Sequence, residues 1–307
     1  MTSPSEPVRP VIGITLGDAA GIGPEIIEAA LQSENLSSAF AYRIIGECTD
    51  ARPGEPTPQT AEAARAALEE AALLAQRGEI AAVVTGPIHK ARMQAIGFNF
   101  PGQTEFFAAR TSTENFAMCL TGGALTVALV TAHVPLKDVA GALCESEIVR
   151  VGMLLEDFLR RRGYQTPRIA VAGLNPHAGE SGALGREEIE IIEPAVKTLQ
   201  SNGNRAVFAG PFSPDTIFNR AVAGEFDGVL CMYHDQGLIP LKLHAFDLGV
   251  NVTLGLPYPR TSPDHGTAFE IAGKGIARAD SMIEAIRLGG ILATHPSVAA
   301  TAESSVS

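Results

Sequence analysis

Short apolar runs alternate along this chain with longer stretches rich in alanine, leucine and glutamate. Six of the short runs predict buried strands: Val11–Leu16, Ala81–Thr85, Leu125–Thr131, Arg168–Ala172, Gly228–Met232 and Val250–Leu254. The longer stretches predict helices over Pro24–Leu31, Ala61–Gln76, Ser146–Arg162, Glu187–Gln200 and Ala279–Leu288. Strands that alternate with helices in this way are typical of an α/β fold with a largely parallel sheet.

The length of the chain predicts the number of domains. At roughly 150 residues per domain, 307 residues predict about two. Since neither a repeat nor a break in composition marks a linker, we expect two domains that share one interleaved chain. The proline-rich stretch Thr49–Thr60 predicts an exposed loop, and the small, polar tails before Pro10 and after Pro296 predict mobile ends.

Charge and cysteine usage exclude several functions. The net charge of −11 argues against a nucleic-acid or anionic-membrane partner, which requires a basic face, but permits a small anionic ligand. The four cysteines form no CxxC pair, so a disulfide framework or zinc knuckle is not expected. Neither a secretory signal nor a membrane-spanning apolar run is present in the sequence, and we expect a cytoplasmic protein.

Polar motifs follow the predicted strands, and three of them carry a histidine. His133 lies in AHVPLKD, His177 in LNPHAGE and His234 in HDQG. Ligands of parallel α/β sheets bind at the carboxyl ends of strands, and three imidazoles with open positions are a common catalytic metal site. Alternatively, each histidine is hydrogen-bonded and packed beneath a loop; both interpretations stay open at this point.

Other strand ends carry weaker signals. GDAAGIGPE, at residues 17–25, either binds an anion at a helix start or serves only as a tight turn, and it matches no nucleotide fingerprint. Lys242, Asn251 and Arg260 are either anion ligands or surface residues. No GxSxG motif suggests a hydrolase. The pair Glu187–Glu188 is expected only to stabilise the start of a helix, where carboxylates interact favourably with the helix dipole.

Taken together, the motifs resemble one family, the 4-hydroxythreonine-4-phosphate dehydrogenases of pyridoxal phosphate biosynthesis. The resemblance rests on GDAAGIGPE, TGPIHK, GQTEFFAART, TAHVPLKDV, GLNPHAGESGALGREE, MYHDQGLIPLK and GVNVTLGLPYPRTSPDHGTA, which occur in this order. It implies a fold like that of isocitrate and isopropylmalate dehydrogenases, with two interleaved α/β/α domains flanking a cleft. The first domain would comprise residues 1–105 and 255–307, and the second, residues 106–254, would carry the metal-binding histidines and a dimer interface.

The resemblance also implies roles for particular residues. His133, His177 and His234 match divalent-metal ligands, for zinc, magnesium or cobalt, and act in catalysis together with Lys242. The positions that match substrate-binding residues are Gln103, Thr104, Lys242, Asn251 and Arg260. Gln103 stands where the family usually has a histidine, so it cannot become cationic. The loop Asp264, His265, Gly266 and Thr267 would contact NAD or NADP.

By this resemblance the expected substrate is 4-(phosphooxy)-L-threonine, a small phosphorylated hydroxy-amino acid, and the expected enzyme is a homodimer with its site at the subunit interface. The oxidised product would then lose carbon dioxide. Gln103 keeps a paralogous dehydrogenase open as an alternative, with threonate or erythronate 4-phosphate or a cis-dihydrodiol dicarboxylate as substrate. A non-catalytic metal- or ligand-binding protein with the same fold is a further alternative. It would be favoured only if the three histidines were not all present.

Overall fold

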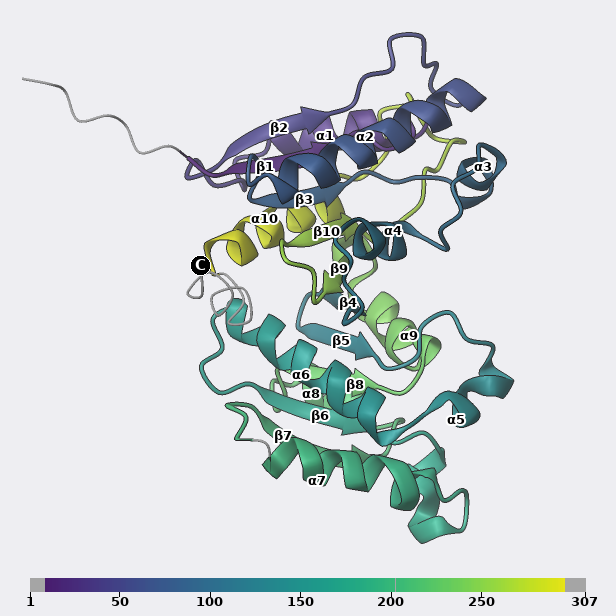
Figure 1. Ribbon diagram of the computed structural model, residues 1–307, viewed down its shortest axis with the longest axis vertical. Coiled ribbons are helices and arrows are strands. Elements are labelled where there is room, and N and C mark those ends of the chain that lie inside the picture. The colour runs from purple at the N-terminus through teal and green to yellow at the C-terminus, as the bar shows by residue number, and fades with distance from the viewer. Residues whose placement is uncertain (1–8, 202, 296–307) are drawn as a thin grey trace, which may run out of the picture. The chain divides into compact units, whose positions relative to one another are not determined.

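The computed structural model describes residues 9–201 and 203–295 (Figure 1). The tails that the sequence predicts to be mobile lie outside these ranges, apart from Arg9. The chain divides into two compact units, both discontinuous in sequence. The first runs up to Phe107 and resumes over Tyr258–Thr294, and the second comprises Ala108–Pro257 together with His295.

The first unit contains a four-stranded parallel sheet in the order β2-β1-β3-β10. Its strands are β1 (Val11–Thr15), β2 (Ala41–Ile45), β3 (Ala82–Thr85) and β10 (Arg260–Pro263). The helices are α1 (Gly23–Leu31), α2 (Pro58–Gln76), α3 (Lys90–Ala95), α10 (Asp280–Thr294) and, starting in this unit, α4 (Gln103–Arg110). Burial of Ile12, Ile14, Val83 and Val84 beneath α2 and α10 supplies much of its hydrophobic stabilisation.

The second unit contains six strands in the order β9-β4-β5-β8-β6-β7. These are β4 (Ala117–Gly122), β5 (Leu125–Leu129), β6 (Arg168–Ala172), β7 (Val207–Phe212), β8 (Gly228–Cys231) and β9 (Val250–Leu254). β4 is antiparallel to both β5 and β9, whereas β5, β8, β6 and β7 are parallel. The sequence prediction of a largely parallel sheet is therefore confirmed.

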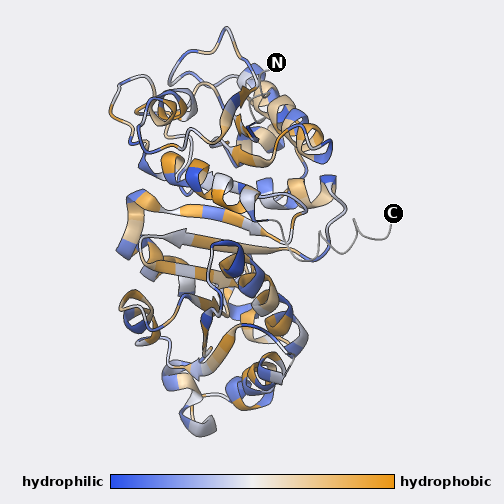
Figure 2. Cartoon of the chain, turned by 90° about the vertical axis from the view of Figure 1, so that its left-hand side faces the viewer, coloured by the Kyte–Doolittle hydropathy of each residue, from blue (hydrophilic) through white to orange (hydrophobic). Residues whose placement is uncertain are grey.

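The helices of the second unit are α5 (Val139–Ala142), α6 (Glu145–Arg161), α7 (Glu193–Ser201), α8 (Ile217–Val222) and α9 (His234–Ala245). Short 3-10 turns occupy Leu136–Asp138, Pro176–Gly182 and Phe246–Leu248, and a π turn occupies Glu188–Ile192. Hydrophobic residues run along the strands, whereas the helices combine hydrophobic and hydrophilic residues (Figure 2). None of the helices within the described ranges is both long and apolar enough to cross a membrane.

All six predicted strands and all five predicted helices are present, with two corrections. The loop predicted over Thr49–Thr60 ends earlier, because α2 begins at Pro58. Thr57 caps this helix: its side chain accepts from Thr60 N, while the Thr60 hydroxyl accepts from Thr57 N. The helix predicted over Glu187–Gln200 begins instead with the π turn and continues as α7.

Candidate functional site

The three histidine-bearing segments leave the same edge of the second sheet. His133 follows β5, His177 follows β6, and His234 is the first residue of α9, directly after β8. Because β8 lies between β5 and β6 and is parallel to both, the carboxyl ends of these strands share one edge. The side chains of His133 and His177 are exposed at this edge rather than packed beneath a loop.

Two of the three imidazoles lie beside each other. The ring centroids of His133 and His234 are 5.9 Å apart, and His234 Nδ1 lies 2.8 Å from Asp235 Oδ1. His177 instead lines a hollow of about 550 Å³ together with Glu193 and Lys197. Within residues 9–201 and 203–295, no group of three or more His, Cys, Asp or Glu side chains is arranged to hold a metal ion. One chain therefore brings together a pair of the predicted ligands, but not all three.

Gln236 joins the segments that carry His177 and His234. Its amide oxygen accepts from Met232 N at 2.6 Å, at the end of β8, and its amide nitrogen donates to Gly173 O at 2.7 Å, at the end of β6. On the other side, the hydroxyl of Thr131 donates to Met232 O at 2.7 Å. A network of buried hydrogen bonds thus connects the strand ends that carry the histidines, a role for Gln236 that no sequence motif indicates.

The turn that follows β6 has an uncommon backbone. From His177 through Ser181 every φ is positive, between 45° and 79°, which is the left-handed region that non-glycine residues rarely occupy. Beneath this turn lies Glu188, whose carboxylate accepts from Leu174 N and Asn175 N, both at 2.7 Å. The prediction that Glu188 merely favours a helix start is therefore wrong, because its carboxylate is buried and hydrogen-bonded to a loop.

Lys242 and Asn251 also lie in the second unit. Lys242 is half-buried, about two turns after His234 in α9. Asn251 lies in β9, and its amide oxygen is buried without a hydrogen-bond partner among the described residues. A buried acceptor that lacks a donor is costly, so this oxygen is suited to receive a donor from a ligand.

Arg260 in the first unit is a buried cation. It opens β10 and is 3% exposed, and its Nη2 donates to Thr85 Oγ1 at 2.6 Å and to Gln103 Oε1 at 2.9 Å. Burial lowers the pKa of the Arg260 guanidinium to about 10, an effect that the charge of nearby Glu105 opposes. The structure thus brings the predicted substrate residues Arg260 and Gln103 into contact, and half-buried Thr104 is next to Gln103 in the first turn of α4.

The two glycine-containing motifs of the first unit pack against each other. Thr267, from the loop Asp264–Thr267, accepts a hydrogen bond from Ile22 N through its carbonyl oxygen at 2.9 Å. A Cβ atom at Gly21 would lie 2.6 Å from that same oxygen, so only glycine permits this approach. In this loop Asp264 N donates to Ser281 Oγ, while His265 Nδ1 lies 3.1 Å from Gly266 O.

Largely parallel sheets with polar residues at the carboxyl ends of their strands define an α/β enzyme, the fold class that the alternating strands and helices predict. A family model described as "Pyridoxal phosphate biosynthetic protein PdxA" matches residues 21–289. The chain belongs to this family.

Named relatives agree with this assignment. A 4-hydroxythreonine-4-phosphate dehydrogenase of Desulfosudis oleivorans is 43% identical over 91% of this chain and 94% of that protein. The crystal structure of a 4-hydroxythreonine-4-phosphate dehydrogenase from Klebsiella pneumoniae is 38% identical, covers 92% of this chain and 99% of that one, and has a TM-score of 0.77. A terephthalate 1,2-cis-dihydrodiol dehydrogenase from Burkholderia xenovorans is similar at 28% identity, 92% and 97% coverage and a TM-score of 0.67.

Proposed function

We propose that this protein is a 4-hydroxythreonine-4-phosphate dehydrogenase. It would oxidise 4-(phosphooxy)-L-threonine at C3 with NAD or NADP to 2-amino-3-oxo-4-(phosphooxy)butanoate, which loses carbon dioxide to give 3-amino-2-oxopropyl phosphate in the biosynthesis of pyridoxal 5'-phosphate. The observation that carries the proposal is the 43% identity to a dehydrogenase of that name over nine tenths of the chain. The strand-end positions of His133, His177 and His234 support it.

Arg260 supplies the recognition of an anionic substrate in this proposal. Its guanidinium is buried, donates to Thr85 and Gln103, and lies near the charge of Glu105. A phosphate or carboxylate would accept charge-assisted hydrogen bonds from it, in a geometry that suits a guanidinium fork. Thr104 and Gln103 would contact the same substrate, while Asn251 would accept a hydrogen bond from it and Lys242 would bind it and relay a proton during catalysis.

His133, His177 and His234 would hold a divalent cation. A set of neutral imidazoles suits zinc or cobalt, and magnesium less well because it prefers oxygen ligands. When bound, such an ion lowers the pKa of a coordinated hydroxyl group and stabilises negative charge on oxygen. The adjacent rings of His133 and His234 fit this role, and His177 would join a site formed with a second subunit.

We also propose a homodimer, supported by the exposed apolar face of α9 and its surroundings. Leu243 is 88% exposed, and Ile239 in the same helix and Phe246 just after it are also largely exposed. Contiguous exposed apolar side chains mark interaction surfaces, and this helix also carries His234 at its start. A second copy that covers the face would lie next to the histidine-bearing edge and could complete the metal site there.

The loop Asp264–Thr267 would line the bound dinucleotide. Support comes from its position after β10 and its packing on the glycine-rich turn before α1, since dinucleotides bind at strand carboxyl ends in α/β folds. The protein residues there would align the cofactor and exclude water, while the cofactor itself carries the redox chemistry.

Substrate assays test the proposed reaction. The protein is incubated with Co²⁺, NAD or NADP and 4-(phosphooxy)-L-threonine, and absorbance of the reduced cofactor is followed. We expect turnover with this substrate and loss of activity in His177→Ala with the circular dichroism spectrum retained. Threonate 4-phosphate, erythronate 4-phosphate and a cis-dihydrodiol dicarboxylate are tested in parallel. A comparable rate with any of them would favour the alternative of a paralogous dehydrogenase, which the neutral Gln103 beside Arg260 keeps open.

A further inference from the structure

A buried carboxylate supports the turn that carries His177. Glu188 is 2% exposed and begins the π turn that precedes α7. Its Oε1 accepts from two consecutive backbone amides, Leu174 N and Asn175 N, while its Oε2 accepts from Asn175 Nδ2 at 2.9 Å. Three donors from the segment between β6 and His177 thus converge on one side chain that is distant from them in sequence.

The intrinsic conformational preferences of residues 177–181 do not favour the left-handed turn that they form. His177, Ala178, Glu180 and Ser181 are L-residues with positive φ, an arrangement that costs free energy at each of them. Such a conformation persists only where the surroundings over-determine it. The carboxylate of Glu188 fixes the entry to the turn, and the bond from Leu184 N to Gly179 O, 3.0 Å long, closes its exit.

The glycines of this segment fit the same role. A Cβ atom at Gly179 would lie 2.6 Å from Glu188 Oε2, and one at Gly173 would lie 3.0 Å from Glu188 Oε1. The backbone therefore approaches the carboxylate closely on two sides. Because these positions have no side chain, the turn can pack directly on Glu188.

From this geometry we infer that Glu188 is a positioning residue: it holds the left-handed turn at 177–181 so that the imidazole of His177 is presented in one place for the divalent ion. The inference rests on the proposed function, in which His177 is a metal ligand. Groups that orient metal ligands affect metal affinity although they do not touch the ion, and their loss typically weakens binding by about 10–100-fold.

The neighbouring Glu187 provides a matched control. Its Oε2 also accepts from Asn175 Nδ2, at 2.7 Å, but no backbone amide of residues 174 or 175 donates to it. Glu187→Gln therefore removes the same charge from the same side-chain donor and leaves the backbone contacts of Glu188 intact. Glu188→Gln keeps the size of the buried side chain but replaces one carboxylate oxygen, an acceptor, by an NH2 group, which would face a hydrogen-bond donor. Glu188→Ala removes all three hydrogen bonds.

The test combines cobalt titration calorimetry with hydrogen exchange of the metal-free protein over residues 174–182. In Glu188→Gln we expect at least a tenfold weaker Co²⁺ affinity and faster exchange in this segment, with values near wild type in Glu187→Gln. At saturating Co²⁺ the kcat of Glu188→Gln should recover, because the ligands themselves remain. If Glu188→Ala does not fold, Glu188→Gln still decides the question.

The outcomes separate the inference from the proposed function. Unchanged Co²⁺ affinity in Glu188→Gln, with or without faster exchange, overturns the positioning role when His177→Ala does lose affinity. Equal affinity in wild type and His177→Ala instead overturns His177 as a metal ligand. In that case exchange decides whether Glu188 holds the turn: faster exchange supports that part of the inference, and unchanged exchange overturns it.

Discussion

Gln103 and Arg260 form a hydrogen bond in which the guanidinium Nη2 donates to the amide oxygen at 2.9 Å. The amide nitrogen of Gln103 donates at 3.2 Å to Gly86 O, just after β3. Both ends of the side chain are thus engaged, and the amide orientation is set by its two partners. Gln103 thus orients the buried cation without adding a charge of its own, whereas the charge of nearby Glu105 acts on the same guanidinium.

Replacing Arg260 by lysine should weaken substrate binding more than it slows turnover. Lysine keeps the charge but lacks the planar fork, so it cannot bind a phosphate and also donate to Thr85 and Gln103 in the present geometry. We expect KM for 4-(phosphooxy)-L-threonine to rise about tenfold or more, which corresponds to about 1.4 kcal/mol, with kcat changed less. Steady-state kinetics measure the effect, and a KM equal to that of the wild type would contradict an anion-binding role.

A negative charge at position 103 should impair binding more than loss of the side chain. In Gln103→Glu the new carboxylate would pair with Arg260 and repel an anionic substrate, whereas Gln103→Ala only releases the guanidinium from one acceptor. We expect KM to increase in the order wild type, Gln103→Ala, Gln103→Glu. Gln94→Glu is the matched control, since residue 94 is exposed in α3 of the same unit. Equal KM values for the two variants at position 103 would count against the charge argument.

Some strands and helices can be predicted from the sequence and others cannot. The difference lies in whether their buried residues form an apolar pattern along the chain. The strand Arg168–Ala172 has four consecutive buried apolar residues, so its unbroken apolar run predicts it. β10 has the sequence RTSP and is nonetheless buried, because Thr261 Oγ1 donates to Ala285 O and Arg260 has acceptors from other segments. α9 contains Pro240 and has little helical periodicity in its sequence.

Site residues are predictable from the sequence where they lie next to an apolar strand. His133, His177 and His234 follow apolar strands directly, so their position at one edge follows from the general rule for parallel sheets. In contrast, Glu188 and Gln236 act through hydrogen bonds to distant residues. Glu188 accepts from Leu174 N, and Gln236 donates to Gly173 O, which follows another strand. Spacing along the chain carries no signal for contacts of this kind.

Gln236 should be important for the stability of the second unit. In Gln236→Glu the side chain keeps its size and its bond from Met232 N, but it can no longer donate to Gly173 O in the ionised form and places a charge in a buried site. We expect a loss of about 1–3 kcal/mol in the free energy of unfolding, measured by urea denaturation at pH 7. Asp235→Asn, at an exposed neighbouring position, is the control for urea denaturation. Equal urea midpoints for Gln236→Glu and wild type would show that the hydrogen bond from Gln236 to Gly173 O contributes nothing to the stability of the protein.

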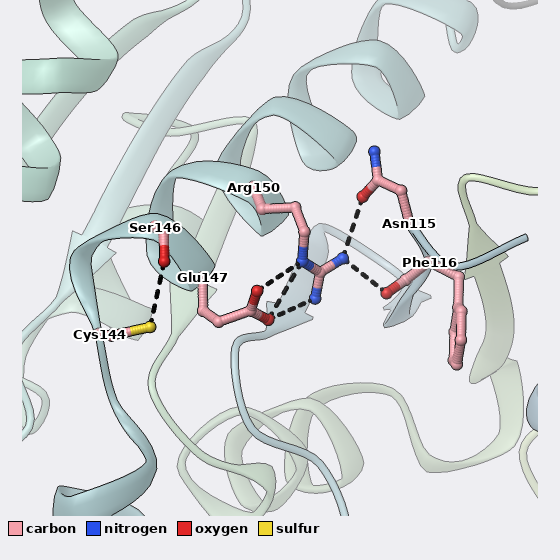
Figure 3. Close-up of polar contacts among 6 residues, drawn as sticks. All are labelled: Asn115, Phe116, Cys144, Ser146, Glu147 and Arg150. Carbon is pink, nitrogen blue, oxygen red and sulfur yellow. Dashed lines mark hydrogen bonds and ion pairs between the residues drawn. The ribbon is translucent and has the colours of Figure 1, made fainter.

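Arg150 anchors α6 to the segment before β4, and it does so together with Glu147. Its Nη1 donates to Phe116 O at 2.8 Å and to Asn115 Oδ1 at 3.1 Å, while Nε and Nη2 donate to the Glu147 carboxylate (Figure 3). The hydrogen bonds from Arg150, aided by its charge and opposed by partial burial, hold the pKa of Glu147 below its ordinary value of 4.5.

A lowered carboxyl pKa predicts a stability contribution that acid removes. Because Glu147 has the lower pKa in the folded state, its contribution is fully present above about pH 4.5 and is lost as the pH falls through the folded-state value. Glu147→Gln should therefore cost about 0.5–1 kcal/mol at pH 7, a small effect since the carboxylate is partly exposed, and progressively less below pH 4.5. Urea denaturation of both proteins from pH 7 to pH 3 measures the difference, and a difference that stays constant across this range would show that ionisation of Glu147 does not carry it.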